Sequence, residues 1–128
     1  MSRKLLTAAF LVAAMPIAAH ADGDAAAGKV VFKKCFACHE AEQDKSKVGP
    51  SLAGVFGRTA GTYPKFKYSR NMVELGQAGL VWDDENLKRY LRKPKEVVPK
   101  GTMAFVGLPK DEDLENVIAY LKADPKPQ

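Results

Sequence analysis

Two cysteines and a histidine occur together in Cys35-Phe36-Ala37-Cys38-His39, and this short segment constrains the chain more than any other part of the sequence. The spacing places two thiols one helical turn apart, with an imidazole directly after the second thiol. Such thiols can add to the two vinyl groups on one edge of a haem, and the adjacent imidazole can then ligate the iron. The motif therefore predicts a haem held covalently by Cys35 and Cys38, with His39 as an iron ligand.

Two other uses of a Cys-x-x-Cys pair fit this sequence less well. A structural zinc site needs four ligands, whereas the whole chain has two Cys and two His, and one of these, His20, falls in a segment expected to be removed. A thioredoxin-like dithiol belongs near a strand-helix-strand pattern, and no convincing strand precedes Cys35. Haem attachment is the preferred interpretation, and a haem-free dithiol protein is the alternative.

The first 21 residues have the parts of a secretory signal peptide. Arg3 and Lys4 form a positive start, residues 5–14 are apolar, and an Ala-His-Ala cleavage site ends at Ala21. The apolar run is too short to span a bilayer, although a retained N-terminal anchor is an alternative interpretation. Cleavage near Ala21 predicts a periplasmic protein in which residues 22–128 form a single domain.

Cleavage also changes the charge and the histidine content. The number of Lys and Arg residues falls from 20 to 18 against 15 Asp and Glu, so the formal net charge falls from +5 to +3. Haem propionates lower it further, and we therefore expect no nucleic-acid partner. Loss of His20 leaves His39 as the only histidine, which excludes bis-histidine ligation within the mature chain.

Three helices are predicted, which indicates an all-α fold. The first covers 24–32 and leads to the cysteines, the second covers 83–92, and the third covers 110–123. Each has acidic residues near its start and apolar residues at helical spacing, and the second and third are followed by proline. The segments between them, 40–81 and 93–109, are long and contain glycine and proline. Loops of this length are uncommon unless they are functional, and here they can wrap a cofactor.

Two methionines, Met72 and Met103, remain after removal of the predicted signal peptide, and either is a candidate for the second axial ligand of the iron. A thioether paired with His39 stabilises reduced iron and raises its potential. Met103 follows His39 by 64 residues on the later loop, whereas Met72 lies on the earlier loop, just before an expected short helix. By spacing alone, either methionine is more often core filler than a ligand.

The whole mature length resembles class I cytochromes c of the mitochondrial and bacterial cytochrome c2 type. The resembling stretches are 28–32, 35–39, 48–58, 66–69, 81–82, 87–94 and 103–107. The resemblance implies a small cytochrome c fold, in which the N-terminal and C-terminal helices pack together. Further short helices and long loops would wrap one covalently bound haem c.

The resemblance also assigns roles to individual residues. Cys35 and Cys38 would carry the thioethers, and His39 and Met103 would be the axial iron ligands. The carbonyl of Pro50 would accept a hydrogen bond from the imidazole and set its tautomer. The remaining implied cofactor contacts are Arg58, Tyr68 and Trp82, around the buried propionate, and Tyr90, near the Met103 sulfur. Without a haem, Trp82 and Tyr90 would be interpreted as core aromatics, Arg58 as a solvated loop charge and Pro50 as a turn residue.

Three further features bear on the expected packing. The missing side chain of Gly28 should let the first helix approach Tyr120 on the last, with Phe32 nearby. The stretch 99–103 reads Pro-Lys-Gly-Thr-Met where the family usually has Pro-Gly-Thr-Lys-Met, so the backbone contacts before the ligand differ. Arg70 stands where the family is usually acidic or small, which leaves open whether the adjacent Asn71 joins the buried polar network.

The function implied by the resemblance is a soluble, monomeric one-electron carrier rather than an enzyme. A cytochrome bc complex would be the donor, and a terminal oxidase, photosynthetic reaction centre or reductase would be the acceptor. Docking on an acidic surface is expected through lysines near the haem edge: Lys34, Lys47, Lys95 and Lys110. A haem peroxidase or gas-binding protein is the alternative, but the sequence offers no distal histidine or dedicated acid-base pair.

Overall fold

The structure is a computed structural model that describes residues 23–128, so the predicted signal peptide and its cleavage site lie outside the described residues. Regular structure in this range is helical, with one isolated antiparallel bridge between Thr59 and Val81. The helices are α1 (Ala25–Phe32), α2 (Arg70–Gln77), α3 (Asp84–Arg92), α4 (Pro94–Val97) and α5 (Asp111–Lys122). The all-α prediction is confirmed. No helix within 23–128 is long and apolar enough to cross a membrane.

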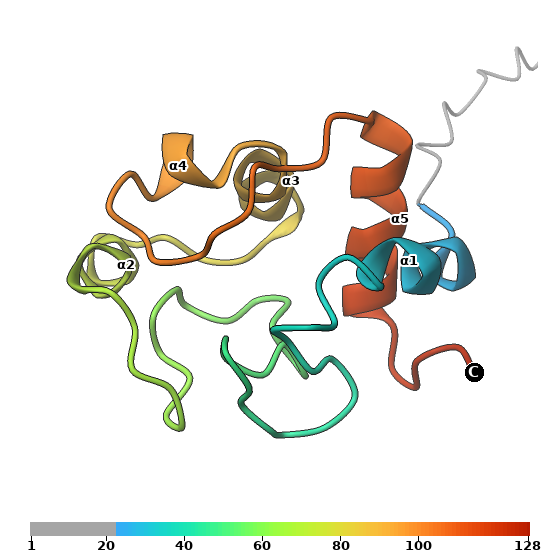
Figure 1. Ribbon diagram of the computed structural model, residues 1–128, viewed down its shortest axis with the longest axis horizontal. Helices are drawn as coiled ribbons and strands as arrows, with labels where there is room; N and C mark the ends of the chain where they lie inside the picture. The colour runs from blue at the N-terminus through green and yellow to red at the C-terminus, as the bar shows by residue number, and fades with distance from the viewer. Residues whose placement is uncertain (1–22) are drawn as a thin grey trace, which may run out of the picture.

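The first and last helices pack against each other, as predicted, and α3 packs on both α4 and α5. Figure 1 shows α1 and α5 at one end of the molecule, α2 at the other, and long loops between them. The start of α1 is tied to α5 directly. The Asp24 carboxylate caps α1 by accepting from the backbone N–H of Ala26 at 2.8 Å, while the Asp24 N–H donates to Asn116 Oδ1 at 2.8 Å.

Gly28 allows the close contact between α1 and α5. A Cβ placed there would lie 2.8 Å from the Tyr120 Cβ, 2.5 Å from the Asn116 carbonyl carbon and closer still to its oxygen. The rings of Phe32 and Tyr120 pack beside this point with centroids 5.3 Å apart. Glycine is therefore required here by the approach of two backbones, as the sequence predicted.

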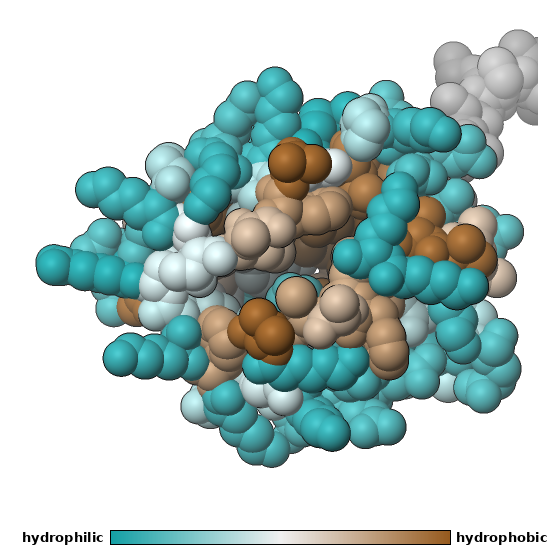
Figure 2. Space-filling view, viewed as in Figure 1, coloured by the Kyte–Doolittle hydropathy of each residue, from teal (hydrophilic) through white to brown (hydrophobic). Residues whose placement is uncertain are grey.

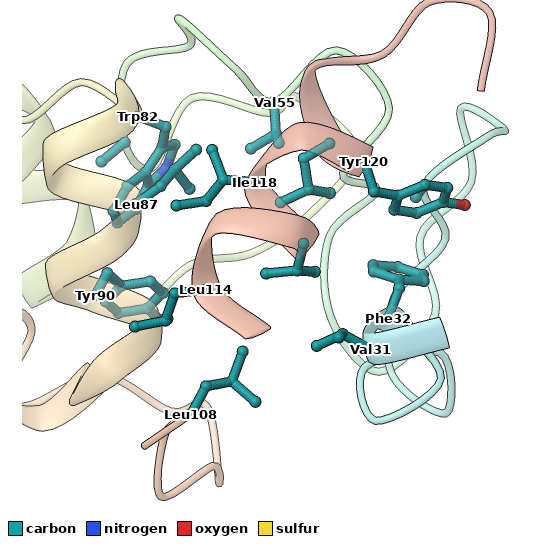
Figure 3. Packing of buried hydrophobic residues seen from close by; sticks show 14 of the residues in the cluster. Val31, Phe32, Val55, Trp82, Leu87, Tyr90, Leu108, Leu114, Ile118 and Tyr120 are labelled. Carbon is teal, nitrogen blue, oxygen red and sulfur yellow. The ribbon is translucent and has the colours of Figure 1, made fainter. Parts of the chain in front are cut away.

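The apolar core lies on two sides of α5. Val31 and Phe32 of α1 lie on one side, and Figure 3 shows Leu87 and Tyr90 of α3 on the other side, facing Leu114 and Ile118. Leu87 and Tyr90 of α3 thus belong to the same apolar cluster as the terminal helices.

One expectation about the loops was wrong, and one short helix had no assigned position. Met72 does not precede a short helix but is the third residue of α2, whose N-terminus is capped by the Ser69 hydroxyl. The segment 93–109 was predicted as a long segment with no helix assigned to particular residues, and the structure places α4 within it, beginning at Pro94. Proline is compatible with the first turn of a helix because its missing N–H would be unpaired there anyway. Pro94 therefore both follows α3 and opens α4.

Candidate functional site

The cysteine motif continues the end of α1 as a tight turn. The backbone N–H groups of Cys38 and His39 both donate to the Cys35 carbonyl, at 3.0 and 2.9 Å, and Phe36 donates to Phe32 at 3.0 Å. Both thiols are free, that of Cys35 half-buried and that of Cys38 exposed. Burial raises the pKa of the Cys35 thiol, while the charge of Lys34 opposes this shift. The turn therefore presents two unpaired thiols directly before the histidine.

The His39 imidazole is held from two directions. Its Nδ1 lies 2.8 Å from the Pro50 carbonyl oxygen, and because a carbonyl can only accept, Nδ1 carries the proton. A Cβ on Gly49 would lie 2.8 Å from Nδ1 and 2.9 Å from Nε2, so the ring rests on a bare backbone. The Gly49 N–H donates to the Cys38 carbonyl at 2.8 Å, which closes the loop on the motif. The remaining nitrogen, Nε2, is left with its lone pair for a metal.

The environment of His39 also favours the neutral, ligating form. Burial lowers the pKa of the imidazole, the hydrogen bond to Pro50 opposes that shift, and the charge of Lys47 adds to it. A metal ligand must be the unprotonated imidazole. The surroundings of His39 therefore favour the neutral imidazole, which is the form that can coordinate iron.

Met103 lies beside the hydroxyl of Tyr90. The Tyr90 hydroxyl donates to the Met103 sulfur at 3.8 Å, and the Tyr90 ring packs on Trp82 with centroids 4.8 Å apart. Burial raises the pKa of Tyr90 to about 12, so the hydroxyl keeps its proton and remains a donor. Of the two candidate methionines, Met103 is thus the one whose sulfur has an oriented polar neighbour. Met72 packs from α2 against the apolar cluster.

Arg58 is held among backbone carbonyls next to Trp82. Its guanidinium donates to the carbonyls of Ser51 and Ala53 at 3.0 and 2.6 Å. The backbone carbonyl of Arg58 accepts a hydrogen bond from the backbone N–H of Trp82 at 2.9 Å. Burial raises the pKa of the Tyr68 hydroxyl, and the charge of Arg58 opposes this shift. The structure therefore brings together the three residues expected around a propionate.

Two contacts of the site were not assigned a role from the sequence. Gly49 supports the imidazole face, and its only sequence signal is its place before Pro50 in a Gly-Pro turn. The Asn71 side chain accepts a hydrogen bond from the Lys100 N–H at 3.0 Å, across 29 residues of sequence. No periodic sequence pattern predicts a hydrogen bond between residues so far apart in the chain.

The residues fit a haem better than a bare metal ion. Figure 2 shows a hollow on the face seen in Figure 1, with apolar atoms around its mouth. Partly buried apolar side chains from several loops pack against the core, including Leu52, Leu80 and Phe105. Residues 23–128 contain no group of three or more His, Cys, Asp or Glu side chains able to hold a metal ion. One imidazole, one thioether and two thiols in an apolar setting match a porphyrin iron.

Comparison with known proteins agrees with this chemistry. The family model described as Cytochrome c matches residues 25–123. Cytochrome c2 of Afifella marina is 50% identical over 98 residues, covering 76% of this chain and 79% of that protein. Cytochrome c2 of Agrobacterium tumefaciens (strain II Chrys) is 48% identical over 101 residues, covering 78% and 91%.

The fold agrees as well. The solved structure of cytochrome c2 from Rhodospirillum centenum has a TM-score of 0.74 at 42% identity and covers 78% of this chain and 97% of its own. With both family model and close relatives spanning most of its length, the chain belongs to the cytochrome c family, as a class I electron-transfer protein of the cytochrome c2 type that carries one covalently attached haem c.

Proposed function

We propose that this protein is a soluble periplasmic one-electron carrier whose haem iron is ligated by His39 and Met103. The observation that carries the proposal is the contact between the Tyr90 hydroxyl and the Met103 sulfur, which singles out one of two candidate thioethers. A haem in this site supplies a reversible one-electron change at iron. Cys35 and Cys38 are the attachment points.

The residues of the chain each perform a separate part of this task. Pro50 and Gly49 keep the His39 ring in one orientation and one tautomer. Tyr90 restrains the Met103 sulfur by donating its hydroxyl proton. With a haem bound, His39 and Met103 would leave no iron position open to exogenous ligands, and this would favour electron transfer over peroxidase or gas-binding chemistry.

Arg58, Tyr68 and Trp82 are proposed to face the buried propionate. Arg58 retains hydrogen-bonding capacity beyond the two carbonyls that hold it, because a guanidinium has five donors. A fixed cation near a propionate offsets the cost of burying that charge. The three residues would therefore stabilise an anionic edge of the cofactor in an otherwise apolar pocket.

The partner surface is proposed to be formed by Lys34, Lys47, Lys95 and Lys110, and to accept an acidic donor or acceptor. Lys34 pairs with Asp113 at 3.8 Å and Lys47 with Glu40 at 3.8 Å. Lys95 donates to the Gly101 carbonyl. The long pair of the exposed Lys34 is weak, so a partner carboxylate can replace it, whereas Lys47 is partly buried and also donates to the Phe36 carbonyl at 2.7 Å.

The export signal and the likeness to cytochromes c2 support a periplasmic monomer. Its donor would be a cytochrome bc complex, and its acceptor a terminal oxidase, reaction centre or reductase. These partners differ in chemistry but share the need for a mobile carrier.

The ligand assignment is tested by comparing Met103→Ala with Met72→Ala in the haem-loaded protein. Met103→Ala is expected to keep the haem attached, to lower the reduction potential and to let the ferric protein bind imidazole. Met72→Ala also removes an apolar side chain and is the matched control. Redox titration and imidazole titration give the answer, and exchanged phenotypes would show that the wrong methionine was assigned.

A further inference from the structure

We propose that Asn71 is a positioning residue that holds the Met103 loop in place for iron ligation; this rests on the proposed His39 and Met103 ligation. The Asn71 side-chain oxygen accepts a hydrogen bond from the Lys100 N–H at 3.0 Å. Lys100 precedes Met103 by three residues. The bond therefore joins α2 to the loop that carries the thioether.

The Asn71 side chain projects from a firmly anchored part of the fold. Within residues 23–128, α2 makes no substantial contact with another helix, and it is held instead by loop backbone. A Cβ on Gly76 would lie 2.9 Å from the Ala60 carbonyl carbon, and a Cβ on Gly61 would lie 2.9 Å from the Val73 Cα. These two close approaches leave α2 little freedom to slide, so Asn71 offers a fixed acceptor.

Apart from the contact of the Tyr90 hydroxyl with the Met103 sulfur, the loop segment before Met103 has its other hydrogen bonds on the side of α4. The Gly101 N–H donates to the Val98 carbonyl at 3.0 Å, and the Lys95 ammonium donates to the Gly101 carbonyl. The ends of these bonds all lie in the segment from α4 to Gly101, so they can move together with the loop. Among the described residues, the hydrogen bond from Lys100 is the one that ties this loop to α2.

Loss of the Asn71 acceptor should therefore weaken the positioning of the Met103 sulfur without changing the chemistry of the thioether. A net hydrogen bond changes an equilibrium by about two- to tenfold. Imidazole competes with Met103 for ferric iron, so its apparent affinity reports how often the thioether is released. Asn71→Ala is expected to raise that affinity by about two- to tenfold.

Two variants separate positioning from general stability. Asn71→Asp keeps an oxygen acceptor for the Lys100 N–H and is expected to restore most of the wild-type imidazole affinity. Ser69→Ala removes the hydroxyl that accepts from the Met72 N–H at 3.2 Å and caps α2, but leaves the Asn71 acceptor in place. It is expected to lower the unfolding temperature while leaving imidazole affinity near wild type.

The experiment is an imidazole titration of the ferric holoproteins, followed by absorbance, with hydrogen exchange of the Lys100 amide measured in parallel. Faster Lys100 exchange and tighter imidazole binding in Asn71→Ala, reversed in Asn71→Asp, support the proposal. Unchanged imidazole affinity in Asn71→Ala, or an equal gain in Ser69→Ala, overturns it. If Met103→Ala itself fails to open the iron, the ligand assignment is wrong instead, so the two failures are distinguishable.

Discussion

Replacing Gly28 by alanine tests whether the contact between α1 and α5 is set by backbone approach. Alanine normally stabilises a helix relative to glycine, by about 0.5–1 kcal/mol. At Gly28 the new Cβ would meet the Asn116 carbonyl group and the Tyr120 Cβ, where 3.4 Å is the start of ordinary contact. The nearest atoms belong to backbone, so they cannot turn aside as a flexible side chain could. The helices must instead separate, by about 1 Å, to admit the added methyl group.

Such separation would loosen the packing of Phe32 on Tyr120 and weaken the hydrogen bond from the Asp24 N–H to Asn116. Overpacking of this kind costs about 1–3 kcal/mol, which exceeds the gain in helix propensity. We therefore expect a net loss of about 1–2 kcal/mol in the free energy of unfolding. For a domain of this size that corresponds to a fall in Tm of about 4–10 °C.

The assay is guanidinium unfolding of the ferric holoprotein, followed by far-ultraviolet circular dichroism. Ala26→Gly on the exposed face of the same helix is the control. It should lose about 0.5–1 kcal/mol through helix propensity alone. If Gly28→Ala were as stable as the wild type or more stable, the backbone-contact argument would be refuted.

Two further predictions concern charged residues at the surface. Hydrogen bonds from Lys65 and Tyr63 lower the pKa of the Asp44 carboxyl, so they stabilise the folded protein when this carboxyl is ionised. The stabilisation is fully present above the ordinary carboxyl pKa and is lost as pH falls through the lowered pKa of Asp44. Asp44→Asn should thus show a smaller loss of unfolding free energy between neutral and acid pH, measured by denaturant titration, and an unchanged acid loss would contradict this. Lys110→Glu should slow electron transfer to an acidic partner and flatten its salt dependence in stopped-flow measurements. Lys122→Glu, at a lysine paired with Asp84 at 3.0 Å, should do much less, and equal losses would mean that net charge governs association.

The parts of the fold that could be predicted are those with local signals. The helices α3 and α5 have acidic first turns and apolar stripes, and α1 has an Asp24 cap, so their bounds were found to within one residue. The role of Gly28 was also predicted, because its missing side chain was expected to let the first helix approach Tyr120 on the last. The helix α4 was missed because four residues are too few to show a period.

The contacts of the site also divide into those that the sequence could predict and those that it could not. The position of His39 and its carbonyl partner Pro50 belong to compact motifs and could be predicted. The contact between Asn71 and Lys100 joins α2 to a loop that is distant in sequence, and it depends on how α2 sits against the backbone of Ala60. No local pattern carries that information, since a side-chain amide on a first helical turn is most often solvated.

The packing of the first helix against the last also sets an order of events in time. If the chain is exported as proposed, its N-terminal end crosses the membrane first, so α1 and the cysteine turn arrive before α5, the last of the described helices. Until α5 arrives, Phe32 lacks its Tyr120 partner and the core cannot close. The thiols of Cys35 and Cys38 could therefore meet their cofactor after export and before α5 packs, so that attachment precedes closure of the core.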